Sequence, residues 1–161
     1  MIAPWLERTR VLQGPQKKDR EQEEQALGRS RGGFSTKIHV GVDALGNPLR
    51  FLLTGGQRHD ITQAEALIAD YEFERVVADR SYDSDDFLLV IAEKQAEAVI
   101  PPRKNRKASR EYDKHLYKER HLVECFIGKI KHYRRIFSRY DKLDKRYLGF
   151  LSFAGTLILL R

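Results

Sequence analysis

Two acidic residues of the sequence are placed where a divalent metal ion could be bound. Asp79 ends a short apolar run, Arg75–Asp79, and Glu124 lies within a long amphipathic segment. Carboxylate oxygens are hard ligands that suit Mg²⁺ or Mn²⁺, and phosphate oxygens can complete the coordination shell. Two such ions, roughly 4 Å apart, can clamp the attacking and leaving oxygens of a phosphoryl transfer. These residue types therefore indicate metal-dependent chemistry on a phosphate ester.

Glu124 belongs to a spaced set of polar residues, Tyr117, Arg120, Glu124 and Lys131. On a helix they fall within about a sixth of the circumference, so they share one face. An apolar face lies beside them, made of Leu116, Val123, Ile127, Ile130 and Phe137. The pattern predicts one helix from Tyr117 to about residue 140, with Glu124 beside the core. The alternative is an ordinary Arg120 and Glu124 ion pair on a solvated helix.

Asp79 ends a segment that predicts a strand covered on both faces, because Arg75–Asp79 shows no alternation. A helix over 84–95 and a second apolar strand over 98–100 complete a crossover unit. An acid that ends such a strand projects from the carboxyl edge of the sheet, where ligands gather. The alternative is a solvated strand end. The neighbouring acids are interpreted as capping and first-turn residues of the helix: Asp83, Asp85 and Asp86.

The remaining pattern predicts one domain over 34–161. Phe34–Asp43 alternates and predicts a strand with one buried face, carrying Ile38, Val40 and Val42. Turn residues over 43–48 and an apolar run over 49–54 predict a hairpin. A helix capped by Asp60 or Thr62 is expected to run to about residue 71, with Ala64, Leu67 and Ile68 inward. Another is expected over 147–160, which is too short to span a bilayer of about 30 Å. Residues 1–33 show no period and are expected to be poorly ordered.

The composition is that of a basic globular protein. The chain has 161 residues, a formal charge of +7 and a sequence pI of about 9.6. This charge favours a polyanion such as nucleic acid, although a well-solvated basic protein is the alternative. Basic segments lie at 103–110 and 129–145. The single cysteine, Cys125, and the spacing of the histidines do not indicate a zinc site. The sequence carries no export signal, which favours the cytoplasm.

These motifs together resemble the catalytic core of bacterial insertion-sequence transposases of the DDE (Asp-Asp-Glu) type, in the group related to insertion sequence five. The resemblance covers about residues 26–161 and includes Ala78–Asp83, Gly28–Gly33, Thr36–His39 and Leu53–Gln57. It implies an α/β fold with a ribonuclease-H-like mixed sheet flanked by helices. It also implies bound Mg²⁺ or Mn²⁺, with two ions in the complete site, double-stranded DNA (transposon ends and target) as partner, and a homodimer of the intact enzyme. Neither a membrane nor a small-molecule cofactor is implied.

The resemblance also assigns roles to individual residues. Asp79 and Glu124 would bind metal and act in catalysis. Arg120 and Lys131 would contact DNA phosphate near the cut strand, and Tyr117 would orient the site. The basic segment Gly28–Gly33 adds two further residues that would contact DNA, Arg29 and Arg31.

The sequence departs from this family at the first catalytic aspartate, which should lie on a strand upstream of Gly28. No such strand is predicted, so the fold is expected with its first strand missing. Asp19 lies in a segment too polar for a buried strand, and Asp43 suits a hairpin turn better, although it could face the site. We therefore expect a truncated or frameshifted transposase that lacks independent catalysis. The alternatives are a non-catalytic DNA-binding fragment, regulatory or relic, and a general basic nuclease.

Overall fold

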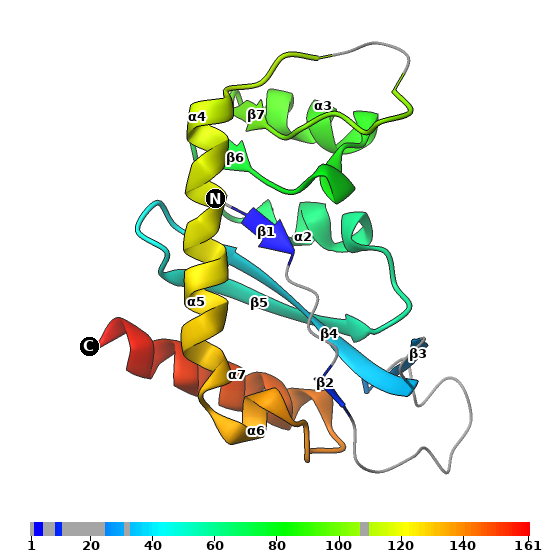
Figure 1. The fold of residues 1–161 in the computed structure, drawn as a ribbon, viewed down its shortest axis with the longest axis vertical. Coiled ribbons are helices and arrows are strands. Elements are labelled where there is room, and N and C mark those ends of the chain that lie inside the picture. Colours follow the sequence, from blue (N-terminus) through cyan, green and yellow to red (C-terminus); the bar gives the residue numbers. More distant parts are fainter. Residues whose placement is uncertain (1, 5–8, 11–24, 31–32, 107–109) are drawn as a thin grey trace.

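The structure is a computed structural model (Figure 1), and it describes residues 2–4, 9–10, 25–30, 33–106 and 110–161. Its central strand is β4 (Gly33–Val42), which pairs antiparallel with β5 (Pro48–Gly55). Asp43 closes the connecting turn, because its Oδ1 accepts the backbone N–H groups of Leu45 at 2.8 Å and Asn47 at 2.9 Å. The predicted hairpin is confirmed, and so is the place of Asp43 in its turn.

Three short strands pair antiparallel with β4: β1 (Ile2–Pro4), β2 (Thr9–Arg10) and β3 (Gly28–Ser30). The sequence predicted that the strand upstream of Gly28 is missing. The structure contains such a strand, β1, so this prediction was wrong. Three residues that include a proline are too few to show a hydrophobic period, and β1 is recognised as a strand by its pairing with β4. β1 contains no acidic residue. The expectation of disorder falls mostly on residues outside the described ranges.

The predicted crossover unit is confirmed. β6 (Arg75–Val77) pairs parallel with β7 (Glu97–Val99), and α3 (Asp85–Glu93) connects them. A short 3-10 helix, η2 (Arg80–Tyr82), lies between β6 and α3. β1 contacts both β4 and β6, so the strands follow one another in the order β5, β4, β1, β6 and β7 (Figure 1). The result is a mixed α/β arrangement.

The carboxyl-terminal part is helical. Its elements are α4 (Lys114–Tyr117), η3 (Lys118–Arg120), α5 (His121–Lys131), α6 (Arg134–Phe137) and α7 (Asp144–Leu159). The expected helix to residue 140 ends earlier, because Tyr133 has extended backbone angles, φ −81° and ψ 106°. Phe137 consequently leaves the apolar face and is 56% exposed. The predicted core helix at the carboxyl terminus is confirmed as α7. No helix among the described residues is long and apolar enough to cross a membrane.

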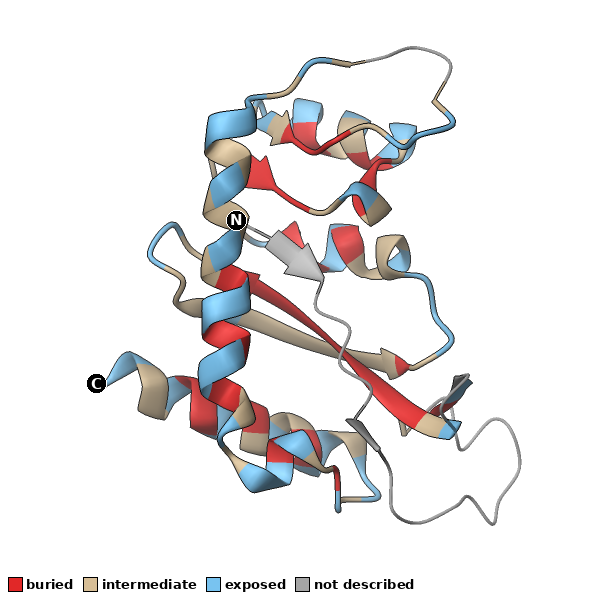
Figure 2. Cartoon of the chain, viewed as in Figure 1, coloured by how far each residue is buried: buried red, intermediate tan, exposed pale blue. Residues whose placement is uncertain are grey.

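Hydrophobic cores cover both faces of β4 (Figure 2). Ile38, Val40 and Val42 pack against α5 and α7. The opposite side is covered by η1 (Asp60–Gln63) and α2 (Ala64–Ile68), with the expected residues of α2 buried. Lys37 and His39 are buried on that side, so the prediction of one buried face was wrong. Alternation of polar and apolar residues predicted a solvated face, but here the polar face is covered by a helix.

Candidate active site

Asp79 lies just beyond the carboxyl end of β6, as the strand pattern predicted. Its backbone is extended, with φ −67° and ψ 160°, and it caps η2. The Oδ1 atom of Asp79 accepts the backbone N–H of Ser81 at 2.8 Å. This bond fixes the direction of the carboxylate relative to the end of the strand. Because carboxylate oxygens accept several partners, Asp79 keeps capacity for a ligand.

Tyr117, Arg120 and Glu124 form a connected stripe on the helical segment from α4 to α5. The guanidinium of Arg120 lies 5.9 Å from the ring centroid of Tyr117, and it forms an ion pair with Glu124. Contrary to expectation, the Glu124 side chain is 53% exposed. On α5, Glu124 lies about 100° around the helix axis from Val123, outside the buried face that Val123, Ile127 and Ile130 form. The ordinary (i, i+4) ion pair is therefore what the structure contains.

Electrostatic coupling connects this stripe with Asp79. The pKa of Tyr117 is raised above its ordinary value, first by burial; Arg120 opposes the shift, and the negative charge of Asp79 adds to it. The charge of Asp79 thus belongs to the electrostatic environment of Tyr117, and Arg120 connects Tyr117 with Glu124.

The other predicted contact residues are more dispersed. Lys131 is half-buried at the end of α5, where it lines a small cavity with Ile38 and Phe126. Arg29 is exposed on β3, next to the amino-terminal end of β4. Arg31 lies outside the described residues. Cys125, beside Glu124, is a free and exposed thiol.

A divalent cation suits the carboxylate chemistry of this site, but the described acids do not by themselves surround an ion. Among residues 25–30, 33–106 and 110–161, no group of three or more His, Cys, Asp or Glu side chains could hold a metal. Mg²⁺ is commonly bound by only one or two carboxylates, with water and phosphate oxygens as further ligands. Asp79 and Glu124 are therefore of the residue type that such an ion accepts.

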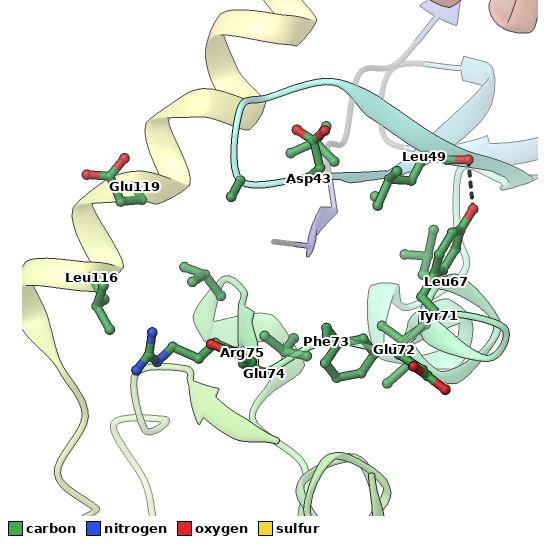
Figure 3. A pocket seen from close by; sticks show the side chains of 16 residues that line it. Asp43, Leu49, Leu67, Tyr71, Glu72, Phe73, Glu74, Arg75, Leu116 and Glu119 are labelled. Carbon is green, nitrogen blue, oxygen red and sulfur yellow. Dashed lines mark hydrogen bonds between the residues drawn. The ribbon is translucent and has the colours of Figure 1, made fainter. Parts of the chain in front are cut away.

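Asp43, which could have been a further carboxylate, is engaged by hydrogen bonds within its own turn. It is held in its turn, where Asn47 Nδ2 also donates to Asp43 Oδ2 at 2.9 Å, and its pKa is lowered by these hydrogen bonds, although burial opposes the shift. Figure 3 shows Asp43 and Glu119 at a cavity of about 550 Å³ that Arg75, the first residue of β6, also lines. Asp79 follows the opposite end of that strand.

Sequence reasoning missed a buried polar cluster close to Asp79. Lys37 Nζ lies 2.8 Å from Asp60 Oδ1, and His39 Nε2 lies 2.8 Å from Thr54 Oγ1. Tyr82 is fully buried, and its pKa is raised well above the ordinary value by burial and by the charges of Asp60 and Asp79. The available signal was a lysine and a histidine that alternate with the apolar residues of β4.

Asp83 was also misinterpreted. We expected a helix cap, but its side chain is 0% exposed and accepts hydrogen bonds from the loop over 103–110. Ser84 holds the cap position of α3 instead, and Asp85 and Asp86 lie in its first turn as predicted. Two arginines of the first basic segment, Arg106 and Arg110, are consequently engaged with Asp83.

The comparison with known families decides the classification. A family described as Transposase DDE domain matches residues 9–159. The chain belongs to this transposase family. The resemblance stated from the motifs is thereby confirmed, and the mixed α/β fold is compatible with it.

Two transposases of insertion sequences are similar to the chain. One, from Brucella ovis, is named for insertion sequence element IS6501; it is 40% identical over 130 residues, which are 80% of this chain and 100% of the relative. The other, from Burkholderia cepacia, is named for IS402 and is 31% identical over 142 residues, which are 81% of this chain and 64% of that relative. The chain therefore spans somewhat less than two thirds of the second transposase. No solved structure is significantly similar to it.

Proposed function

We propose that this transposase chain takes part in metal-dependent cleavage and transfer of DNA strands, with Asp79 and Glu124 as two of the acids that bind the metal. Membership of the family supports a role in the transposition of an insertion sequence. The finer proposal is carried by the strand-end carboxylate of Asp79, which the Ser81 amide holds in place, and by the connected stripe of Tyr117, Arg120 and Glu124. The strand order is consistent with a ribonuclease-H-like fold, which is part of the same proposal.

The ion pair of Arg120 and Glu124 suggests how the site would meet DNA. Guanidinium groups bind phosphate as readily as carboxylate, through charge-assisted hydrogen bonds. A DNA phosphate would draw Arg120 away from Glu124, and the freed carboxylate could then turn toward Asp79. Mg²⁺ or Mn²⁺, when bound, would polarise the phosphate and stabilise charge on its oxygens. Tyr117 would limit the positions that Arg120 can take, because the guanidinium lies over its ring.

DNA would be held mainly through its backbone. Lys131, Arg29 and Arg31 would add phosphate contacts, and the excess of positive charge would favour binding without reading of bases. Binding should weaken steeply with salt, because neutralised phosphates release counterions. We extend the proposal to a homodimer that acts on double-stranded transposon ends and target.

A cleavage assay with matched controls tests the assignment. Purified chain, alone and fused to its upstream reading frame, would be incubated with Mn²⁺ and duplexes that carry the ends of the element, because the chain alone is expected to lack independent catalysis. Asp79→Asn and Glu124→Gln are expected to reduce cleavage to background. Asp86→Asn and Glu119→Gln, which make the same chemical change on α3 and η3, should retain the wild-type rate. Equal loss in the controls, or full activity of Glu124→Gln, would refute the assignment.

A second candidate is a non-catalytic DNA-binding role, regulatory or relic. It is favoured by the ion-paired, exposed state of Glu124 and by the lack of a three-acid group within the described ranges. Salt-sensitive DNA binding that is unchanged in Glu124→Gln, together with wild-type protein that neither cleaves DNA nor binds Mn²⁺ in its presence, would support this role.

A further inference from the structure

A buried carboxylate anchors the basic loop that follows β7. Asp83 is 0% exposed; its Oδ2 accepts the backbone N–H of Arg103 at 2.7 Å, and its Oδ1 accepts the guanidinium of Arg106 at 2.6 Å. The guanidinium of Arg110 lies 3.5 Å from the same Oδ1. We call Asp83 and these three arginines the arginine strap. A carboxylate removed from water needs such partners, so the loop is held firmly at Asp83.

The strap reaches Asp79 through a single residue. The guanidinium of Arg103 donates to the backbone carbonyl of Ser81 at 3.0 Å. The backbone N–H of Ser81 donates to Asp79 Oδ1 at 2.8 Å. Ser81 therefore connects the two: its carbonyl accepts a hydrogen bond from the loop, and its backbone N–H orients the Asp79 carboxylate. Tyr82, the next residue, is fully buried and limits the movement of this turn.

The charge balance leaves the strap able to bind an anion. The loop carries three guanidinium groups but meets only two carboxylates: Arg106 pairs with Asp83 and Asp85, Arg110 lies near Asp83, and the Arg103 guanidinium donates to a backbone carbonyl. The pKa of Arg106 is raised, first by its hydrogen bond to Asp83. Lys104 adds exposed positive charge on the same loop. A DNA phosphate bound there would compete for the same guanidinium groups.

We infer that Arg103 and Asp83 are positioning residues, which set the direction of the Asp79 carboxylate and make it respond to a phosphate backbone bound on the loop. This inference rests on the proposed function only for the role of Asp79. The strap itself concerns contacts within the chain. Neither residue touches the reacting atoms; both act through Ser81.

Hydrogen–deuterium exchange of a peptide that includes residues 79–83 tests the strap without any catalytic readout. Arg103→Ala removes the bond to the Ser81 carbonyl, and exchange of the Ser81 amide should become roughly tenfold faster, the size expected for the loss of one hydrogen bond. Lys104→Ala is the matched control, because it removes the same charge from the same loop. It should leave this peptide unchanged.

Duplex DNA provides the second measurement. Adding DNA to the wild-type chain should change the exchange of this peptide, and Arg103→Ala should abolish that response while binding DNA about as well as Lys104→Ala. Exchange that is unaltered in Arg103→Ala, or altered equally in both variants, would overturn the inference. Asp83→Asn, which keeps the side chain's shape, should also accelerate exchange of this peptide. If the Asp83→Asn protein unfolds, the comparison of Arg103→Ala with Lys104→Ala still tests the inference.

The two proposals fail separately. If Arg103→Ala accelerates exchange but the wild-type chain neither cleaves DNA nor binds Mn²⁺, the strap stands and the metal-dependent function fails. If the wild-type chain cleaves DNA and Arg103→Ala lowers the cleavage rate no more than Lys104→Ala, the positioning role is wrong.

Discussion

Acid should destabilise this protein through His39. The imidazole is fully buried, and burial lowers its pKa from 6.5 to about 4; Asp60 opposes the shift and Lys37 adds to it. Between pH 6.5 and 4 the unfolded chain therefore binds a proton at this histidine that the folded chain excludes. The contribution of His39 to the free energy of unfolding is fully present above its unfolded pKa of 6.5, and it is lost as the pH falls from 6.5 toward 4.

The size of the effect follows from the shift. Each pKa unit corresponds to about 1.4 kcal/mol, so the stability lost through His39 is about 2 kcal/mol at pH 5 and about 3 kcal/mol well below pH 4. Urea unfolding at pH 7.5, 6 and 5 would measure it. His39→Gln, which can still bond to Thr54 but does not titrate, should lose about 2 kcal/mol less than wild type between pH 7.5 and 5.

The matched control is His132→Gln, which replaces an exposed histidine on the same chain. It should follow the wild-type pH dependence. Parallel pH profiles for wild type and His39→Gln would refute the reasoning, since the proton excluded at His39 would then contribute nothing. A wild-type chain that gains stability toward pH 5 would refute the direction.

Three further substitutions have expected effects on unfolding in urea. Arg139→Ala should lower the free energy of unfolding by about 3 kcal/mol or more. The fully buried guanidinium donates to the carbonyls of Asp141 at 2.8 Å and Lys142 at 2.9 Å, and both carbonyls would lose this partner. A decrease under about 1 kcal/mol would contradict this. Gly155→Val should cost about 1–3 kcal/mol, because a Cβ atom there would already lie 3.2 Å from the Phe51 ring and 3.3 Å from Pro48; an unchanged midpoint would show that α7 can shift. Glu124→Gln should change stability by less than about 0.5 kcal/mol, as expected for an exposed (i, i+4) pair, and a larger loss would mean that the carboxylate supports the fold.

Sequence patterns correctly predicted the elements whose structure depends on residues that are close together in the sequence. The hairpin at Asp43, the parallel pair β6 and β7, and the burial of Val123, Ile127 and Ile130 follow from turn residues, continuous apolar runs and helical spacing. The placement of Asp79 at a strand end was predicted in the same way. What these features share is that neighbours in sequence decide them.

The errors concern contacts between distant segments. Asp83 has the sequence context of a helix cap, but its partners lie about twenty residues further on, in a loop whose conformation no period predicts. Lys37 and His39 alternate as solvated residues do, and only the packing of η1 and α2 buries them. β1 is too short to be predicted without its partner. Glu124 lies about 100° around α5 from the buried Val123, and only the packing of neighbouring elements decides that this edge of the apolar face is exposed.

The buried guanidinium of Arg139 has a consequence for the synthesis of this chain. It donates to Thr36 Oγ1 and to the carbonyl of Ala26, which precede it by 103 and 113 residues. The face of β4 that carries Ile38, Val40 and Val42 packs against α5 and α7, so this face cannot be covered until the last helices have left the ribosome. Until then the nascent chain exposes these three apolar side chains. Premature termination before residue 139 should therefore leave an aggregation-prone product that depends on chaperones.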